Sequence, residues 1–209
     1  MSIKQAYNNW ADYYDTNENK TRDLEAVALR KTLADLRFYN CLELGCGTGK
    51  NTEWFLTKAK SVTAVDFSDE MLSKAKEKIK SGNVMFCQAD INNDWNFTNK
   101  QFDLITFSLV LEHIENLDVV FQKAAKAITA NGYVYVGELH PFKQYMGSKA
   151  RFESANGMEV LTCFNHHISD FTDAAKASGF DLINTSEFFD DDARTGIPRI
   201  LALLFSSKL

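Results

Sequence analysis

Glycines separated by single residues are the feature that most limits how this chain can fold. Gly45, Gly47 and Gly49 follow the short apolar run 41–44 and precede a segment of helical character. A glycine turn between a strand and a helix is typical of the first βα unit of an open α/β sheet. Such a turn brings backbone N–H groups and the positive end of the helix dipole close to a ligand. The glycines alone are also compatible with a tight turn that binds nothing.

Apolar periodicity continues this alternation of strand and helix along the chain. The helix that starts at Asp69 has Ser68 as its expected N-cap. The first helix is expected to bury a stripe of Leu24, Val27, Ala28 and Leu36. The patterns predict strands at 41–44, 61–66, 84–89, 102–107 and 132–139, and helices at 22–36, 51–58, 69–80, 117–128 and 169–178.

The end of the chain departs from this alternation. Two strand-like runs, 180–188 and 200–206, are joined only by residues 190–199, which have no helical stripe. So short a connection favours an antiparallel hairpin over a helical crossover. We therefore predict a doubly wound, Rossmann-like α/β fold with a mixed sheet, one reversed strand and helices on both faces.

Composition and charge limit the partners of the chain. Its 209 residues contain no linker-like break, so a single domain is expected. A formal net charge of −5 argues against a nucleic-acid partner, because phosphate binding needs clustered Lys and Arg. No apolar run has signal-peptide or transmembrane character, so we expect a cytoplasmic protein without a membrane partner. We also expect a monomer or a homodimer.

The cysteines Cys41, Cys46, Cys87 and Cys163 are widely spaced, and none belongs to a CxxC pair. Reduced, buried thiols are therefore expected rather than disulfides or a zinc site. No HExxH motif is present, so no metal cofactor is expected.

Acidic residues at the ends of two predicted strands are candidates for holding a nucleoside. Asp66 ends the second strand, from where a carboxylate can accept hydrogen bonds from ribose hydroxyls, although an acid near a helix start is the alternative. Asp90 and Ile91 follow the third strand, and Phe67 and Met71 are either adenine walls or core.

The glycine spacing bears on the choice between nucleoside cofactors. The NAD turn reads GxGxxG, whereas the glycines here run GxGxG and Lys50 stands at the expected third position. This difference disfavours a nicotinamide oxidoreductase, which stays the enzymatic alternative.

Successive motifs of the chain resemble those of class I S-adenosylmethionine-dependent methyltransferases, in the small-molecule branch similar to methyltransferase type 11. The motifs are Glu43-Leu44-Gly45-Cys46-Gly47-Thr48-Gly49, then Val65-Asp66-Phe67-Ser68 with Met71-Leu72, then Ala89-Asp90, Phe102-Asp103-Leu104-Ile105 and Leu111-Glu112-His113-Ile114. The resemblance implies a seven-stranded sheet with a reversed last strand. It also implies an N-terminal cap at about residues 1–36, with Tyr7 to Tyr14 similar to a cap helix.

The resemblance also implies S-adenosylmethionine as cofactor and a site for each of its parts. Gly45 and Gly47 would hold the methionine portion, and Glu43 would position the glycine loop or bind the cofactor amine. Ser108 and Leu109 would line the sulfonium side, and Tyr14 would cover the carboxylate. The full set of expected cofactor-binding residues is Tyr14, Glu43, Gly45, Cys46, Gly47, Asp66, Phe67, Met71, Asp90, Ile91, Ser108 and Leu109.

The acceptor side is less constrained by the sequence. His113 and His140 follow the fourth and fifth strands and are candidate catalytic residues, or else hydrogen-bonded structural histidines. Residues 140–167 have no clear period and are interpreted as a substrate lid. The candidate substrate-binding residues are Tyr7, Tyr145, Arg151, His166 and Arg199.

These features predict methyl transfer from S-adenosylmethionine to an O, N or C atom of a small molecule. A protein that binds the cofactor without catalysis is the second alternative.

Overall fold

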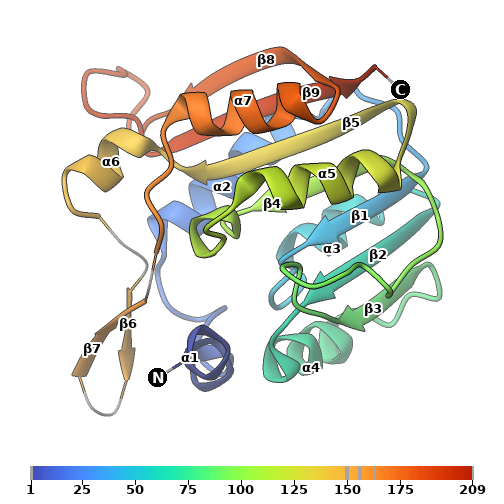
Figure 1. The fold of residues 1–209 in the computed structure, drawn as a ribbon. Coiled ribbons are helices and arrows are strands. Elements are labelled where there is room, and N and C mark those ends of the chain that lie inside the picture. Colours follow the sequence, from blue (N-terminus) through green and yellow to red (C-terminus); the bar gives the residue numbers. More distant parts are fainter. Residues whose placement is uncertain (1, 149–150, 155–156, 162, 209) are drawn as a thin grey trace.

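The computed structural model describes residues 2–148, 151–154, 157–161 and 163–208, with 151–154 and 157–160 as backbone only. A seven-stranded sheet runs through its centre in the order β3-β2-β1-β4-β5-β9-β8 (Figure 1). The strands are β1 Asn40–Leu44, β2 Ser61–Asp66, β3 Val84–Gln88, β4 Phe102–Ser108, β5 Ile128–Leu139, β8 Phe180–Phe188 and β9 Ile200–Ser207.

The pairing of the strands confirms the predicted mixed sheet. The pairs β2–β3, β1–β2, β1–β4 and β4–β5 are parallel, whereas β9 is antiparallel to both β5 and β8. The last strand is thus the reversed one, because the link between β8 and β9 is too short to carry the chain across the sheet.

Helices cover both faces of the sheet. On one face, α5 (Leu117–Ala127) and α7 (Ile168–Ala177) pack on a core cluster that contains Phe107, Phe121 and Phe205. On the other face, α2 (Lys20–Thr32), α3 (Lys50–Phe55) and α4 (Asp69–Lys78) pack on a second cluster. Figure 1 shows α5 and α7 in front of the sheet and α2 and α3 behind it.

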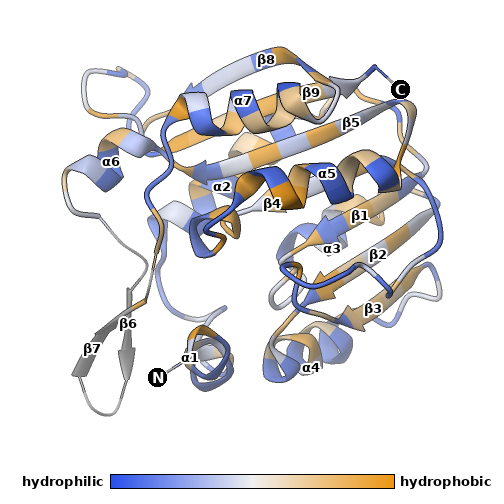
Figure 2. Ribbon diagram, viewed as in Figure 1, coloured by the Kyte–Doolittle hydropathy of each residue, from blue (hydrophilic) through white to orange (hydrophobic). Residues whose placement is uncertain are grey.

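β9 illustrates why the central strands read as continuous apolar runs. Leu201, Leu203 and Phe205 belong to the first cluster, and the alternate residues Ile200 and Ala202 belong to the second. Because successive side chains point to opposite faces and both faces are covered, the positions of β9 from Ile200 to Phe205 are all apolar. β9 is accordingly orange along most of its length in Figure 2.

One member of the stripe predicted for the helix at 22–36 is wrong, because Val27 is 40% exposed. Ala28 is buried, and Leu24 and Leu36 pack against the second cluster, as expected. Glu25 and Leu29 are buried as well. Glu25 accepts a hydrogen bond from the Tyr135 hydroxyl at 3.3 Å, so a polar contact with β5 helps to set which side of α2 faces the sheet. The helix also ends at Thr32 instead of extending to residue 36.

Short elements that the periodicity did not predict surround the carboxyl ends of the parallel strands. They are the helix α1 (Ile3–Trp10), the 3-10 helix η1 (Leu111–His113), the helix α6 (Pro141–Tyr145) and the antiparallel pair β6 (Arg151–Ser154) and β7 (Gly157–Val160). Figure 1 places α1 opposite the arrowheads of the parallel strands. Within the described ranges, none of the helices has the length and apolar character needed to cross a bilayer.

Candidate active site

A cavity of about 530 Å³ lies at the carboxyl ends of the parallel strands, a volume within the usual range of small-molecule sites. Its walls come from five parts of the chain: the N-terminal segment, the glycine turn, the end of β2, the segment after β3 and the turn after β4. This is the crevice where open α/β sheets bind their ligands.

The glycine turn forms one wall, and its backbone geometry explains the glycine at its start. Gly45 has a φ of +78°, and a Cβ atom on it would lie 2.9 Å from the Cβ of Val110. Gly47 has a φ of +53°, and its nearest neighbour would be the Tyr14 ring at 4.0 Å. The turn therefore needs glycine both for its left-handed backbone and for its close approach to the segment after β4.

Asp66 connects the end of β2 to the glycine turn. Its carboxylate accepts hydrogen bonds from the backbone N–H groups of Gly47, at 2.8 Å, and Ser68, at 2.9 Å. Burial raises the pKa of Asp66 to about 6, and these backbone hydrogen bonds oppose that rise. Each carboxylate oxygen keeps a lone pair for a ligand.

The cavity brings together most of the expected cofactor-binding residues. Those that line it are Tyr14, Gly45, Gly47, Asp66, Phe67, Met71, Asp90, Ile91, Ser108 and Leu109. Glu43 and Cys46 lie outside the lining of the cavity. Glu43 is buried beneath the turn, where it accepts a hydrogen bond from the Thr52 hydroxyl, and burial raises its pKa to about 8. That contact ties β1 to α3, which fits the positioning role among the two expected for Glu43.

Tyr7 and His113 meet on the opposite wall. The Tyr7 hydroxyl lies 2.9 Å from His113 Nε2, and both residues line the cavity. Burial raises the pKa of Tyr7 well above its ordinary value, so its hydroxyl keeps its proton. The Glu112 carboxylate lies 3.9 Å from His113 Nε2, and burial raises the pKa of Glu112 to about 7. The contact between Tyr7 and His113 joins α1 to η1.

The other two histidine candidates lie away from the cavity lining. His140 is fully buried at the start of α6, where its Nδ1 accepts from the Phe142 N–H at 3.2 Å. Its Nε2 lies 3.0 Å from the Glu187 carboxylate on β8. His166 is also buried, and its Nε2 lies 2.7 Å from the Ile114 carbonyl oxygen. These contacts fit structural, hydrogen-bonded histidines at both positions.

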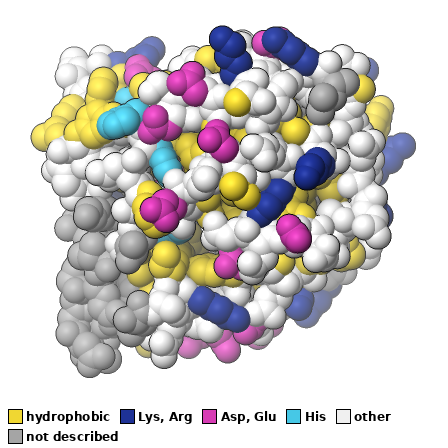
Figure 3. Space-filling model, viewed as in Figure 1, with side chains coloured by type: hydrophobic (Ala, Val, Ile, Leu, Met, Phe, Trp, Pro, Cys, Tyr) yellow, Lys and Arg dark blue, Asp and Glu magenta, His cyan; other side chains and the backbone are white. Residues whose placement is uncertain are grey.

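Tyr145 and Arg199 do not line the cavity either. Tyr145 is 51% exposed on α6, and its hydroxyl lies 2.6 Å from His167 Nδ1. Figure 3 shows hydrophobic side chains gathered over α6 beside histidine atoms. Arg199 pairs with Asp190 and donates to the Thr21 hydroxyl at 3.2 Å. The side chain of Arg151 lies outside the described part of the chain.

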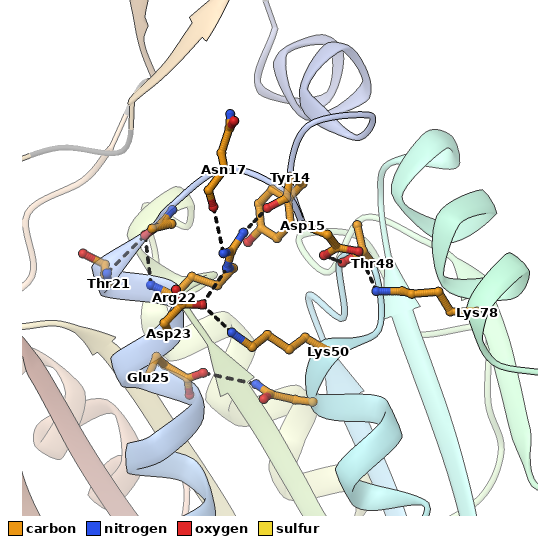
Figure 4. A network of polar contacts seen from close by, with 12 residues as sticks. Tyr14, Asp15, Asn17, Thr21, Arg22, Asp23, Glu25, Thr48, Lys50 and Lys78 are labelled. Atoms are coloured by element: carbon orange, nitrogen blue, oxygen red, sulfur yellow. Dashed lines mark hydrogen bonds and ion pairs between the residues drawn. The ribbon is translucent and has the colours of Figure 1, made fainter.

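A polar network near Tyr14 contains residues that the sequence reasoning missed. Arg22 reaches from α2 to the backbone oxygens of Tyr14 and Asn17, the latter at 3.0 Å (Figure 4). Asp15 accepts from the Thr48 hydroxyl and from Lys78 Nζ, both at 2.6 Å. The network holds the segment that carries Tyr14 against the glycine turn. Arg22 is close in sequence to Tyr14 and Asn17, whereas Thr48 and Lys78 are distant from Asp15. The members follow no motif, so no sequence signal singled out the network.

In the part of the chain that the structure describes, no group of three or more His, Cys, Asp or Glu side chains is arranged to hold a metal ion.

Known proteins share both the motifs and the fold of this chain. Residues 42–136 of this chain match the family model described as a methyltransferase domain. An uncharacterised methyltransferase of Emericella nidulans is 25% identical, over 86% of this chain and 76% of that protein. The malonyl-[acyl-carrier protein] O-methyltransferase of Priestia megaterium is 27% identical over 78% of this chain, which spans only 56% of that relative.

A solved structure agrees over the whole length. The N-methyltransferase NodS of Bradyrhizobium japonicum, in complex with S-adenosyl-L-homocysteine, has a TM-score of 0.75 at 17% identity, and the match covers 100% of both chains. At that identity the likeness shows the fold. The methyltransferase domain matched over residues 42–136, the methyltransferase relatives and the shared fold together support S-adenosylmethionine-dependent methyl transfer by this chain.

Proposed function

We propose that the cavity binds S-adenosylmethionine and a small-molecule acceptor side by side. The observation that carries this proposal is the meeting of Gly45, Gly47 and Asp66 in one cavity with the wall formed by Tyr7 and His113. The glycine turn and Asp66 suit the cofactor, and the Tyr7–His113 wall suits the acceptor.

The cavity residues fit the parts of the cofactor. The backbone at Gly47 is open to the methionine portion, since a Cβ on Gly47 would meet no atom closer than 4.0 Å, and Gly45 lines the cavity beside it. Asp66 would accept hydrogen bonds from the ribose hydroxyls, because its oxygens have lone pairs beyond those used by Gly47 and Ser68. Asp90 and Ile91 would hold the adenine.

The N-terminal segment is proposed as the cap of the site. Ile3, Tyr7 and Tyr14 all line the cavity, although they lie far from β1 in sequence. α1 is held to α4 by an ion pair between Lys4 and Asp69, at 3.2 Å. A cap over a cavity of this volume favours a small acceptor over a macromolecule. We propose residues 140–167 as a lid that flanks the cap.

The chemistry requires alignment of the acceptor and, for some acceptors, removal of a proton. When bound, S-adenosylmethionine supplies a methyl group that is already electrophilic. Tyr7 and His113 would orient the nucleophilic atom and exclude water. If that atom is a hydroxyl or amine, the Tyr7 oxygen can take its proton while the Tyr7 hydroxyl proton passes to His113 at 2.9 Å. Glu112 would then stabilise the imidazolium.

Two measurements test the proposal. Purified protein freed of bound nucleosides is titrated with S-adenosylhomocysteine by calorimetry, with NADH as the control ligand for the oxidoreductase alternative. Cell extract is then incubated with the protein and methyl-labelled S-adenosylmethionine, and products are separated by mass. Binding and a labelled small molecule are expected. Absence of binding would overturn the proposal, and binding without any product would favour the non-catalytic alternative.

A further inference from the structure

The turn that follows β4 is held by two consecutive residues of β5. The Leu109 N–H donates to the Gly137 carbonyl at 2.8 Å. The next two N–H groups, of Val110 and Leu111, both donate to Glu138 Oε1, at 2.9 Å and 2.8 Å. Backbone groups that leave a strand need partners, and here one side chain satisfies two of them. The turn thus depends on Glu138 for its position over the end of the sheet.

The backbone of this turn does not adopt its shape without support. Leu109 has a φ of 53°, a left-handed conformation that a residue with a Cβ rarely occupies. Such conformations persist where the surroundings hold them in place, and they are frequent at functional sites. The hydrogen bonds on either side of Leu109 supply that constraint. Without the two bonds to Glu138, the turn is free to relax.

The position of the turn sets the shape of the cavity. Leu109, Val110 and His113 all line it. Val110 packs so closely on the glycine turn that a Cβ on Gly45 would lie 2.9 Å from it. A shift of the turn would therefore change the gap between the methionine part of the site and the wall that carries His113.

Glu138 itself does not line the cavity. It is 1% exposed, and its second oxygen, Oε2, is buried with no hydrogen-bond partner among the described residues. Burial raises the pKa of Glu138 well above its ordinary value. Burying a carboxyl group costs free energy unless hydrogen bonds offset that cost, and the two hydrogen bonds from the turn do so here.

We propose that Glu138 is a positioning residue for methyl transfer, which holds the turn after β4 so that Val110 and His113 keep their distance from the glycine turn. This inference rests on the proposed function, since it assigns Glu138 to the same site. Glu138 acts through the turn and contacts neither the cofactor nor the acceptor.

The test compares Glu138→Ala with Glu138→Gln. An Ala side chain cannot accept the two backbone bonds, whereas the Gln carbonyl oxygen can. Amide hydrogen exchange of Val110 and Leu111 is followed by NMR, and S-adenosylhomocysteine affinity is measured by calorimetry. Glu138→Ala is expected to lose the protection of both amides and about tenfold in affinity, while the amides of β2 stay protected. Glu138→Gln is expected to keep both amides protected and to stay within about threefold of the parent affinity.

Glu187→Ala is the matched control, because it removes a carboxylate that accepts a hydrogen bond from His140 outside the cavity lining. It is expected to leave the affinity unchanged. Parent-like affinity in Glu138→Ala, or an equal loss in Glu138→Gln despite protected amides, would overturn the positioning role while the proposed function stands. If the parent protein does not bind S-adenosylhomocysteine, the proposed function fails and the inference falls with it.

Discussion

The glycine turn with Asp66 and the later segment from His140 to Arg199 differ in how well their sequences predicted the site. Gly45, Gly47 and Asp66 line the cavity as expected. In the later segment, His140, His166 and Arg199 have partners elsewhere. In the first region the expected contacts of the glycine turn and Asp66 depend on the backbone next to a strand end. In the second region the expected contacts of His140, His166 and Arg199 depend on where long connections pack.

This difference has a physical origin. Residues at the carboxyl ends of neighbouring parallel strands meet whatever else the chain does, because the sheet brings them together. A side chain after the sheet finds the nearest available partner, as His166 does at the Ile114 carbonyl. The acceptor wall is instead built by Tyr7, which lies near the amino terminus.

The strongest test of the acceptor wall is His113→Ala. Loss of the proposed proton acceptor should lower turnover of an O- or N-acceptor by about 100-fold or more, while S-adenosylhomocysteine affinity changes by about twofold at most. Turnover is measured with the acceptor found in the extract screen. Tyr7→Phe serves as the second variant, because it removes the hydroxyl at 2.9 Å and keeps the ring. Unchanged turnover in both variants would exclude this proton path.

The cofactor side should respond in the opposite way to Asp66→Ala. The change should weaken S-adenosylhomocysteine binding by about 1 to 3 kcal/mol, through the lost ribose hydrogen bonds and the lost anchor of Gly47. Calorimetry measures the effect. Glu70→Ala removes a neighbouring exposed acid on α4 that does not line the cavity, and it should have little effect. Equal affinity in the parent and Asp66→Ala would count against the assigned role.

Gly45→Ala tests whether the glycine turn is as tightly constrained as the structure indicates. The left-handed backbone and the 2.9 Å approach to Val110 should make the substitution cost about 1 to 3 kcal/mol of folding free energy. Thermal unfolding measures that cost. Gly82→Ala is the control, because a Cβ there would meet nothing within 4 Å. A melting temperature equal to that of the parent would mean that the turn adjusts easily.

The buried acids around the site predict an unusual pH dependence. Burial raises the pKa of Asp66 to about 6, of Glu25 and Glu112 to about 7, and of Glu43 to about 8. The folded state therefore binds more protons than the unfolded state between the ordinary carboxyl pKa and these values. Stability from these groups is complete at low pH and is lost as the pH rises through them.

The melting temperature of the cofactor-free protein should therefore fall by a few degrees from about pH 4.5, near the ordinary carboxyl pKa, to about pH 8. Glu43→Gln should make this fall smaller, because it removes one titrating group. S-adenosylhomocysteine affinity should move in the other direction and rise through about pH 6 as Asp66 ionises. A melting temperature that rises over this range would contradict the assigned burial effects.

The smallest effect is expected at the far end of the second region. Arg199→Ala should change S-adenosylhomocysteine affinity by less than about 0.5 kcal/mol, because the guanidinium is paired with Asp190 away from the cavity. Calorimetry again provides the measurement. A large loss would indicate that this residue reaches the ligand after all, and it would restore the sequence-based expectation.

Several predicted strand and helix positions are confirmed, because the apolar periodicity of those segments is strong. β2 and β8 have the predicted bounds, and Ser68 caps α4 by accepting from the Met71 N–H at 3.2 Å. In the predicted stripe at 22–36 only Val27 is exposed, and the stripe missed Glu25, which is buried in contact with Tyr135 of β5, because hydrophobicity alone does not register a buried acid.

The sequence by itself determined the alternation of strands and helices, the reversed last strand and the position of the glycine turn after β1, because these follow from patterns between residues close in the chain. Only the tertiary structure decided that Tyr7 meets His113, that Arg22 braces the segment of Tyr14, and that Glu138 holds the turn after β4. Each of these contacts joins segments whose distance in space is set by packing of the whole domain. No local pattern encodes that distance.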